Sequence, residues 1–192
     1  MYEPKDFSHL LGLEGFSEAL LKNHFTLYQG YVTNTNKLSD LLREHLAADR
    51  TATPEFAEAK RRFGWEFNGL RLHELYFGNL SKAPKSLDAD SSLAKQLVKD
   101  FGTLQDWEKD FKATASLRGI GWVILTYDPI AKKTFNVWIN EHDVGHLTGC
   151  LPLLVIDVFE HAFMLDYGLK RADYIAAFFR AIDWGSVQGR LK

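Results

Sequence analysis

The side chains best suited to chemistry lie near the C-terminus, where an apolar run ends in a carboxylate and an imidazole follows four residues later. Residues 153–156 are apolar and partly β-branched, which predicts a strand buried on both faces. Asp157 would then leave the core at the end of that strand, and a buried carboxylate needs a cation or a metal ion as its partner. Together with His161 it could bind a metal ion. A helix cap beside an unrelated histidine explains the pair equally well, so the pair alone leaves both interpretations open.

The surrounding sequence supplies further matches. Residues 157–163 read Asp-Val-Phe-Glu-His-Ala-Phe, which resembles the Asp-Val-Trp-Glu-His-Ala-Tyr signature of the iron/manganese superoxide dismutases. Other segments similar to that family are residues 31–36, 67–69, 73–81, 119–122 and 182–184. They follow one another in the family's order from about Leu13 to Trp184, so the resemblance covers nearly the whole chain. Several matching segments in the correct order are much more specific than any one of them.

The resemblance implies a superoxide dismutase, an oxidoreductase that converts superoxide to dioxygen and hydrogen peroxide by cycling one iron or manganese ion per subunit. It implies four metal ligands, His24, His73, Asp157 and His161. Three imidazoles and one carboxylate suit manganese, iron or zinc, and the choice between iron, manganese or use of both stays open. A metal-binding relative without this activity is one alternative. A zinc hydrolase is another, although the sequence has no His-Glu-x-x-His motif.

Two residues near the implied ligands, Tyr31 and His142, would be catalytic by the same resemblance. Tyr31 follows His24 by seven residues, where the family usually has eight. Seven residues return to the same face of a regular helix, whereas eight suit a helix with a π-bulge. His142 fits the manganese-type donor to metal-bound solvent, because the iron-type position is occupied by Gly69. His146, in the same loop, is the alternative donor.

Other matched positions concern assembly and substrate attraction. By the resemblance, Glu160 would reach the ligand histidine of a neighbouring subunit, which implies a homodimer or a tetramer. The family's histidine–tyrosine bridge between subunits should be absent, because Tyr28 and Met164 stand at those two positions. The net charge of -2 offers no overall attraction for an anion, so steering must be local. Arg171, by family match, and Lys22 are the candidates for it.

The elements that must hold these residues follow from hydrophobic periodicity and from turn signals. Apolar residues at three- and four-residue steps predict helices over about 16–45, 54–80, 92–101, 103–116 and 171–184. β-rich runs predict strands over 122–127, 134–139 and 151–158, and residues 81–86 form a linker. We therefore expect an α+β fold with an N-terminal domain, 1–84, that is a long antiparallel helical hairpin. A C-terminal domain, 85–192, would contain a three-stranded antiparallel sheet, with the metal site between the two domains.

Composition narrows the class of protein further. Hydrophobic residues make up 46% of the 192 residues and charged residues 25%, as in ordinary globular proteins. The single cysteine, Cys150, rules out an internal disulfide framework, and the first residues lack the pattern of a secretion signal. No apolar run reaches the ~20 residues that a membrane span needs. The slight negative charge argues against a nucleic-acid partner. We expect a cytoplasmic protein that binds neither membranes nor nucleic acid.

Overall fold

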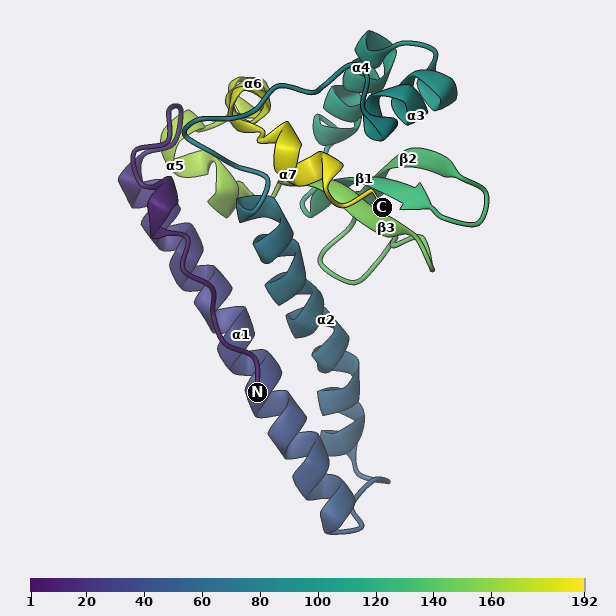
Figure 1. The fold of residues 1–192 in the computed structure, drawn as a ribbon. Helices are drawn as coiled ribbons and strands as arrows, with labels where there is room; N and C mark the ends of the chain where they lie inside the picture. The colour runs from purple at the N-terminus through teal and green to yellow at the C-terminus, as the bar shows by residue number, and fades with distance from the viewer. Residues whose placement is uncertain (192) are drawn as a thin grey trace.

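The computed structural model describes residues 1–191, and its N-terminal half is the expected helical hairpin. The long helices α1 (Glu18–Ala47) and α2 (Pro54–Phe77) run antiparallel and pack against each other (Figure 1). Each begins at a capping hydroxyl, that of Ser17 for α1 and that of Thr53 for α2, which accepts a hydrogen bond from an amide in the first turn. A short 3-10 helix, η1 (Ser8–Leu10), precedes α1.

The C-terminal half contains the expected three-stranded antiparallel sheet. Strands β1 (Trp122–Asp128), β2 (Lys133–Ile139) and β3 (Leu151–Asp157) lie in the order β2-β1-β3. Trp122, at the start of the central strand, is opposite Ile139 on one side and Asp157 on the other. The remaining helices are α3 (Ser92–Phe101), α4 (Leu104–Ala115), η2 (Glu160–Ala162), α5 (Met164–Tyr167), α6 (Arg171–Ala181) and α7 (Trp184–Gln188). The α+β fold class predicted from the sequence is confirmed.

The last predicted helix, 171–184, corresponds to α6, which ends at Ala181, and a separate helix, α7, begins only at Trp184. Ile182, directly after α6, has an extended backbone (ψ 118°) and pairs with Leu80 in an isolated antiparallel bridge. The amide of Asp183 then donates to the carbonyl of Asn79 at 2.7 Å. These contacts break the helix because they attach the chain to the end of α2, and they hold the C-terminal helices against the hairpin.

The outer edge of β3 is held by side chains. Asn79 donates from Nδ2 to the carbonyl of Val155 (2.6 Å), and Arg190 donates to the carbonyl of Leu153 and to Oδ1 of Asn79 (both 2.5 Å). Burial lowers the pKa of Arg190 to about 10, so its guanidinium is still charged at neutral pH. Side chains that bond an unpaired edge also keep it from pairing with another chain. The strand that ends in Asp157 is thereby fixed to the end of α2.

The core lies between α2, the sheet and α6. Trp122, Tyr76 and Phe178 are among its largest fully buried side chains, and the rings of Tyr76 and Phe178 stack with centroids 5.9 Å apart. Burial of such large apolar surfaces holds the two halves together. Among the residues that the structure describes, no helix combines the length and the hydropathy needed to cross a membrane.

Candidate metal centre

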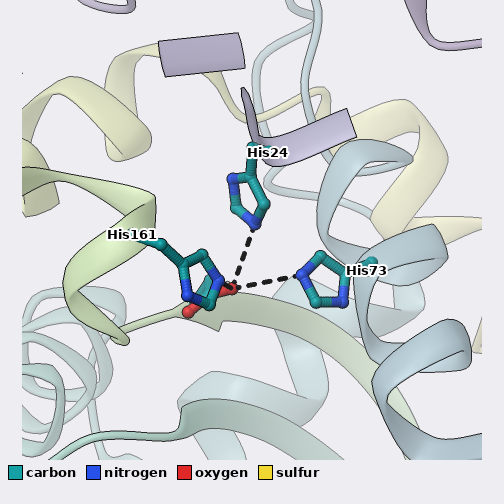
Figure 2. A group of neighbouring side chains, drawn as sticks. His24, His73 and His161 are labelled. Carbon is teal, nitrogen blue, oxygen red and sulfur yellow. Dashed lines mark hydrogen bonds and ion pairs between the residues drawn. The ribbon is translucent and has the colours of Figure 1, made fainter. Parts of the chain in front are cut away.

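Four side chains from four elements meet where the helical hairpin contacts the sheet (Figure 2). His24 comes from α1, His73 from α2, Asp157 from the last position of β3 and His161 from η2. The Nε2 atoms of the three histidines lie 3.2, 3.7 and 3.2 Å from Oδ2 of Asp157, and one donor atom from each residue lies within 4.8 Å of the others. Only His161 is partly exposed, by 27% of its side chain. The structure thus brings together all four residues that the sequence suggests as ligands.

The hydrogen bonds of these donors leave room for a cation. Nδ1 of His73 lies 2.6 Å from the carbonyl oxygen of Gly69, to which it must donate, so Nε2 carries a lone pair. This buried Nε2 has no hydrogen-bond partner among the described residues, which is costly unless an ion binds there. Burial lowers the pKa of both His24 and His73, so their imidazoles are neutral, as metal ligands must be. The residues present therefore fit one iron or manganese ion.

Hydrogen bonds to its neighbours orient the carboxylate of Asp157. Its Oδ1 accepts from the amide of Phe159 (2.8 Å), while Oδ2 faces the histidines. The hydroxyl of Tyr174 donates to the backbone carbonyl of Asp157 at 2.7 Å. Burial alone would raise the pKa of this carboxyl, but His161 and His24 beside it hold that pKa well below its usual range. Asp157 is therefore the anionic member of the donor group.

A chain of hydrogen bonds links Tyr31, His142 and Trp122 beside the four donors. The Tyr31 hydroxyl lies 2.9 Å from Nε2 of His142, whose Nδ1 accepts from the indole N–H of Trp122 (3.0 Å). Because an indole can only donate, the single proton of neutral His142 lies on Nε2 and is donated to the Tyr31 oxygen. Burial lowers the pKa of His142 to about 4, which keeps the ring neutral. His146 is exposed, and its Nε2 contacts the backbone carbonyl of His142 at 2.8 Å.

The seven-residue spacing between His24 and Tyr31 leaves α1 regular. The helix is α-helical throughout, without a π-turn, and the rings of His24 and Tyr31 both pack against the ring of His73. The Tyr31 ring stacks on the ring of His73, with centroids 5.1 Å apart. It fills the space beside α2, where a Cβ on Gly69 would lie 2.6 Å from its Cδ1. Gly69 therefore cannot be exchanged for a residue with a side-chain donor unless Tyr31 moves.

Comparison with known proteins agrees with this geometry. Residues 89–190 match the family described as iron/manganese superoxide dismutases, C-terminal domain. The chain is 36% identical to "Superoxide dismutase [Fe]" of Aquifex pyrophilus, over 99% of this chain and 91% of that protein. The chain belongs to the iron/manganese superoxide dismutase family. It is also 35% identical to "Superoxide dismutase [Mn] 2" of Haloferax volcanii, over 90% of this chain and 85% of that protein. The relatives of this dismutase thus include proteins named for iron and proteins named for manganese.

The two cations suggested for substrate steering in this family member are engaged elsewhere. Arg171 donates at 2.8–3.0 Å to three backbone carbonyls, those of Leu117, Gly119 and Val158. It thereby joins the start of the sheet to the chain after β3. Lys22 forms an exposed ion pair with the glutamate one turn earlier on α1. A steering role for either residue stays a prediction.

Of the three residues suggested for subunit contact, two are exposed and one is buried. Glu160 is exposed beside His161, and Met164 exposes 44% of its surface. Tyr28 is buried instead, and its hydroxyl donates to Oε1 of Glu74 at 3.1 Å. Burial raises the pKa of Tyr28 to about 12. Tyr28 and Met164 therefore do not form a matching polar pair on the surface.

Sequence reasoning missed the residues that cover the Tyr31–His142 pair. The ring of Trp65 lies 4.4 Å from that of His142, and the guanidinium carbon of Arg62 lies 3.7 Å from the centre of the Trp65 ring. A signal was present in α2, because Trp65 lies four residues, about one helical turn, before Gly69, which packs against the Tyr31 ring. Such spacing is common in packed helices, so it did not single out Trp65.

Proposed function

We propose that this chain catalyses the dismutation of superoxide at one iron or manganese ion held by His24, His73, Asp157 and His161. The observation that carries the proposal is the convergence of three imidazoles and one carboxylate within 4.8 Å in a member of this family. When bound, the ion supplies one-electron redox chemistry, because it can alternate between two oxidation states. The protein binds that ion, positions the substrate and supplies protons.

The donor group is suited to an anionic substrate. Burial lowers the pKa of His24 and His73, so these two imidazoles are neutral, and Asp157 contributes one negative charge; with a divalent or trivalent cation bound, the centre would be net positive. Aromatic rings pack around the donors and exclude water from them, which strengthens electrostatic interactions there. Those rings, with centroids 4.9–5.3 Å from a histidine ring, belong to Trp122, Tyr76 and Phe159.

Dismutation to hydrogen peroxide consumes two protons; Tyr31 is placed to donate one of them, and the other is taken from solvent. The hydroxyl oxygen of Tyr31 accepts a hydrogen bond from Nε2–H of His142. The O–H of Tyr31 is therefore free to donate toward the substrate. Burial raises the pKa of Tyr31 above its usual value, and the carboxylates of Asp157 and Glu66 add to the shift. The hydroxyl therefore stays protonated at neutral pH. His142 and Trp122 act as positioning residues, because they set the direction of this hydrogen bond.

Substitution of Asp157 tests the function and the ligand set together. Asp157→Ala removes the anionic donor, so we expect it to lose the metal and to reduce dismutase activity to background. Metal content and superoxide decay would be measured after separate reconstitution with iron and with manganese. Asp90→Ala, at a side chain that is 96% exposed, is the control.

Two results would overturn these assignments. Full metal content in Asp157→Ala would contradict the ligand set. A wild-type protein that holds iron or manganese in every subunit but does not accelerate superoxide decay would contradict the function.

We further propose that the protein acts as a homodimer or a larger homo-oligomer. In support, Glu160 is exposed beside the partly exposed His161, and the nearby Met164 and Leu165 expose 44% and 58% of their surfaces. An acidic group among apolar side chains suits contact with a second copy. The cytoplasmic location and the division into 1–84 and 85–192 stay predictions; the family match begins at residue 89, close to that boundary.

A further inference from the structure

One turn of α2 connects the Tyr31–His142 pair to solvent. The ring of Trp65 lies 4.4 Å from the ring of His142 and 5.5 Å from that of Tyr31, and its outer face is covered by Arg62. Trp65 is half-buried, and the side chain of Arg62 is 41% exposed. A molecule that approaches Tyr31 from this side therefore meets the guanidinium of Arg62 before the donors.

The same turn carries a buried negative charge. Glu66 is only 3% exposed, and it accepts hydrogen bonds from Nε of Arg62 (2.9 Å) and from Nδ2 of Asn34 (3.4 Å). Without that cation, a buried carboxylate would be poorly stabilised and would repel an approaching anion. The charges of Glu66 and Arg62 both act at the site. Burial is the largest cause of the raised pKa of Tyr31; Asp157 and Glu66 raise that pKa further, and Arg62 lowers it.

Superoxide is an anion and the protein carries a net charge of -2, so an unpaired carboxylate beside the site would slow its approach. The guanidinium of Arg171 is bonded to three carbonyls, and Lys22 is paired with a glutamate. Arg62 combines a partly exposed guanidinium with contact to the ring that covers His142.

We propose that Arg62 controls the approach of superoxide, by neutralising Glu66 beside the site and by holding Trp65 against His142. This inference rests on the proposed dismutase function. Arg62 is a steering and positioning residue, because it touches neither the donors nor the reacting atoms.

Neutral substitutions of the two charges test the proposal. In Arg62→Gln the carboxylate of Glu66 loses its cation, so kcat/KM should fall about 3- to 10-fold at about 10 mM salt, where the Debye length is about 30 Å, and should recover as salt is added. Glu66→Gln should do the reverse, with a higher rate at low salt that declines on addition of salt. The double variant should return the salt dependence to that of wild type, because the pair is neutral in both. Arg62→Lys, which keeps the charge but loses the planar stack, should keep the wild-type salt dependence.

A remote control and a second readout complete the experiment. Arg43→Gln makes the same change in net charge at a position 76% exposed and about 18 Å along α1 from Tyr31, so the rate at low salt should fall by much less than in Arg62→Gln. The dissociation constant of azide, a small anion, would be measured by absorption on the metal-loaded proteins at low and high salt. It should rise in Arg62→Gln by the same factor as kcat/KM falls.

The outcomes separate the inference from the proposed function. The inference would be overturned if azide binding in Arg62→Gln and Glu66→Gln kept the wild-type salt dependence. It would also be overturned if both variants lost kcat/KM equally at every salt concentration. If the wild-type protein binds metal and azide but does not consume superoxide, the proposed function fails while the azide series still decides the role of Arg62.

Discussion

At the scale of single residues, the centre depends on which nitrogen of each imidazole carries the proton. The carbonyl of Gly69 accepts a hydrogen bond from Nδ1–H of His73, so Nε2 of His73 directs a lone pair toward the other donors. The indole N–H of Trp122 donates to Nδ1 of His142. The proton of His142 therefore lies on Nε2, which donates a hydrogen bond to Tyr31. Two neutral histidines thus have opposite roles: His73 offers a lone pair to a metal ion, and His142 donates a hydrogen bond.

The buried, neutral His142 predicts how stability changes with pH. The pKa of His142 is about 4 in the folded protein and 6.5 ordinarily, so between these values the unfolded chain binds more protons. The stability that neutral His142 provides is complete above pH 6.5 and is lost as the pH falls toward 4. His142→Gln can accept from Trp122 and donate to Tyr31 but cannot titrate. We expect the metal-free variant to lose less unfolding free energy than wild type over this range, measured by urea titration.

His146→Gln provides the matched control, because His146 lies exposed in the same loop. Its pH dependence of stability should follow that of wild type. Parallel curves for His142→Gln and wild type would show that the folded protein does not hold His142 neutral.

At the scale of elements, α1 and α2 fit together through the ring of Tyr31 and the missing side chain of Gly69. In Gly69→Ala the new Cβ would lie 2.6 Å from the Tyr31 ring, so the ring must move away from His142. We expect a loss of about 1–3 kcal/mol in unfolding free energy, despite the better helix propensity of alanine. Activity should fall as well, because the hydrogen bond to His142 is broken. Thermal denaturation and turnover measure both effects.

Gly64 in the same helix offers the opposite expectation. A Cβ there would meet nothing within 4 Å, so Gly64→Ala should stabilise the protein by about 0.5–1 kcal/mol. The fit between the helices would be unimportant if the two alanine variants changed stability and activity alike.

Much at this scale could be predicted from the sequence, because periodicity and motif spacing are local signals. Periodicity placed the hairpin and the three strands, and the resemblance to the dismutase family named the four donor residues. The break at Ile182 was missed, since an apolar residue continues the helical pattern and its pairing with Leu80 is a long-range contact. The contact of Trp65 with His142 was missed for the same reason: no local pattern specifies where the loop of residues 140–146 lies. Proton positions are equally nonlocal, because Trp122 and Tyr31 decide them for His142.

At the scale of the whole molecule, Arg190 links the C-terminal segment, the end of α2 and the edge of β3. Arg190→Met would leave the carbonyl of Leu153 and Oδ1 of Asn79 without this donor. We expect a loss of about 2–4 kcal/mol in unfolding free energy, since hydrogen bonds from charged groups are the stronger ones. Metal retention should decrease too, because β3 carries Asp157. Urea denaturation and metal analysis measure these losses, and Arg180→Met, on the exposed side of α6, should show neither.

Assembly offers a further prediction at this scale. If the exposed face around Glu160 contacts a second copy, Glu160→Ala should weaken self-association, because the partner loses an interaction next to His161. Sedimentation at a series of concentrations would show the shift toward monomer, and turnover would fall with it. Unchanged sedimentation and unchanged turnover would remove Glu160 from the interface.

The spread of the donors along the chain has a consequence for how the metal is chosen. They extend from residue 24 to residue 161, so a ribosome has synthesised most of the protein before the set is complete. Three of the four are then enclosed, and an ion can leave only when the hairpin and the sheet separate locally. We therefore expect the identity of the ion to be decided at folding, by whichever metal the cell supplies at that moment, and to be kept afterwards. Cells grown in one metal and then transferred to the other should retain the first in protein made before the change.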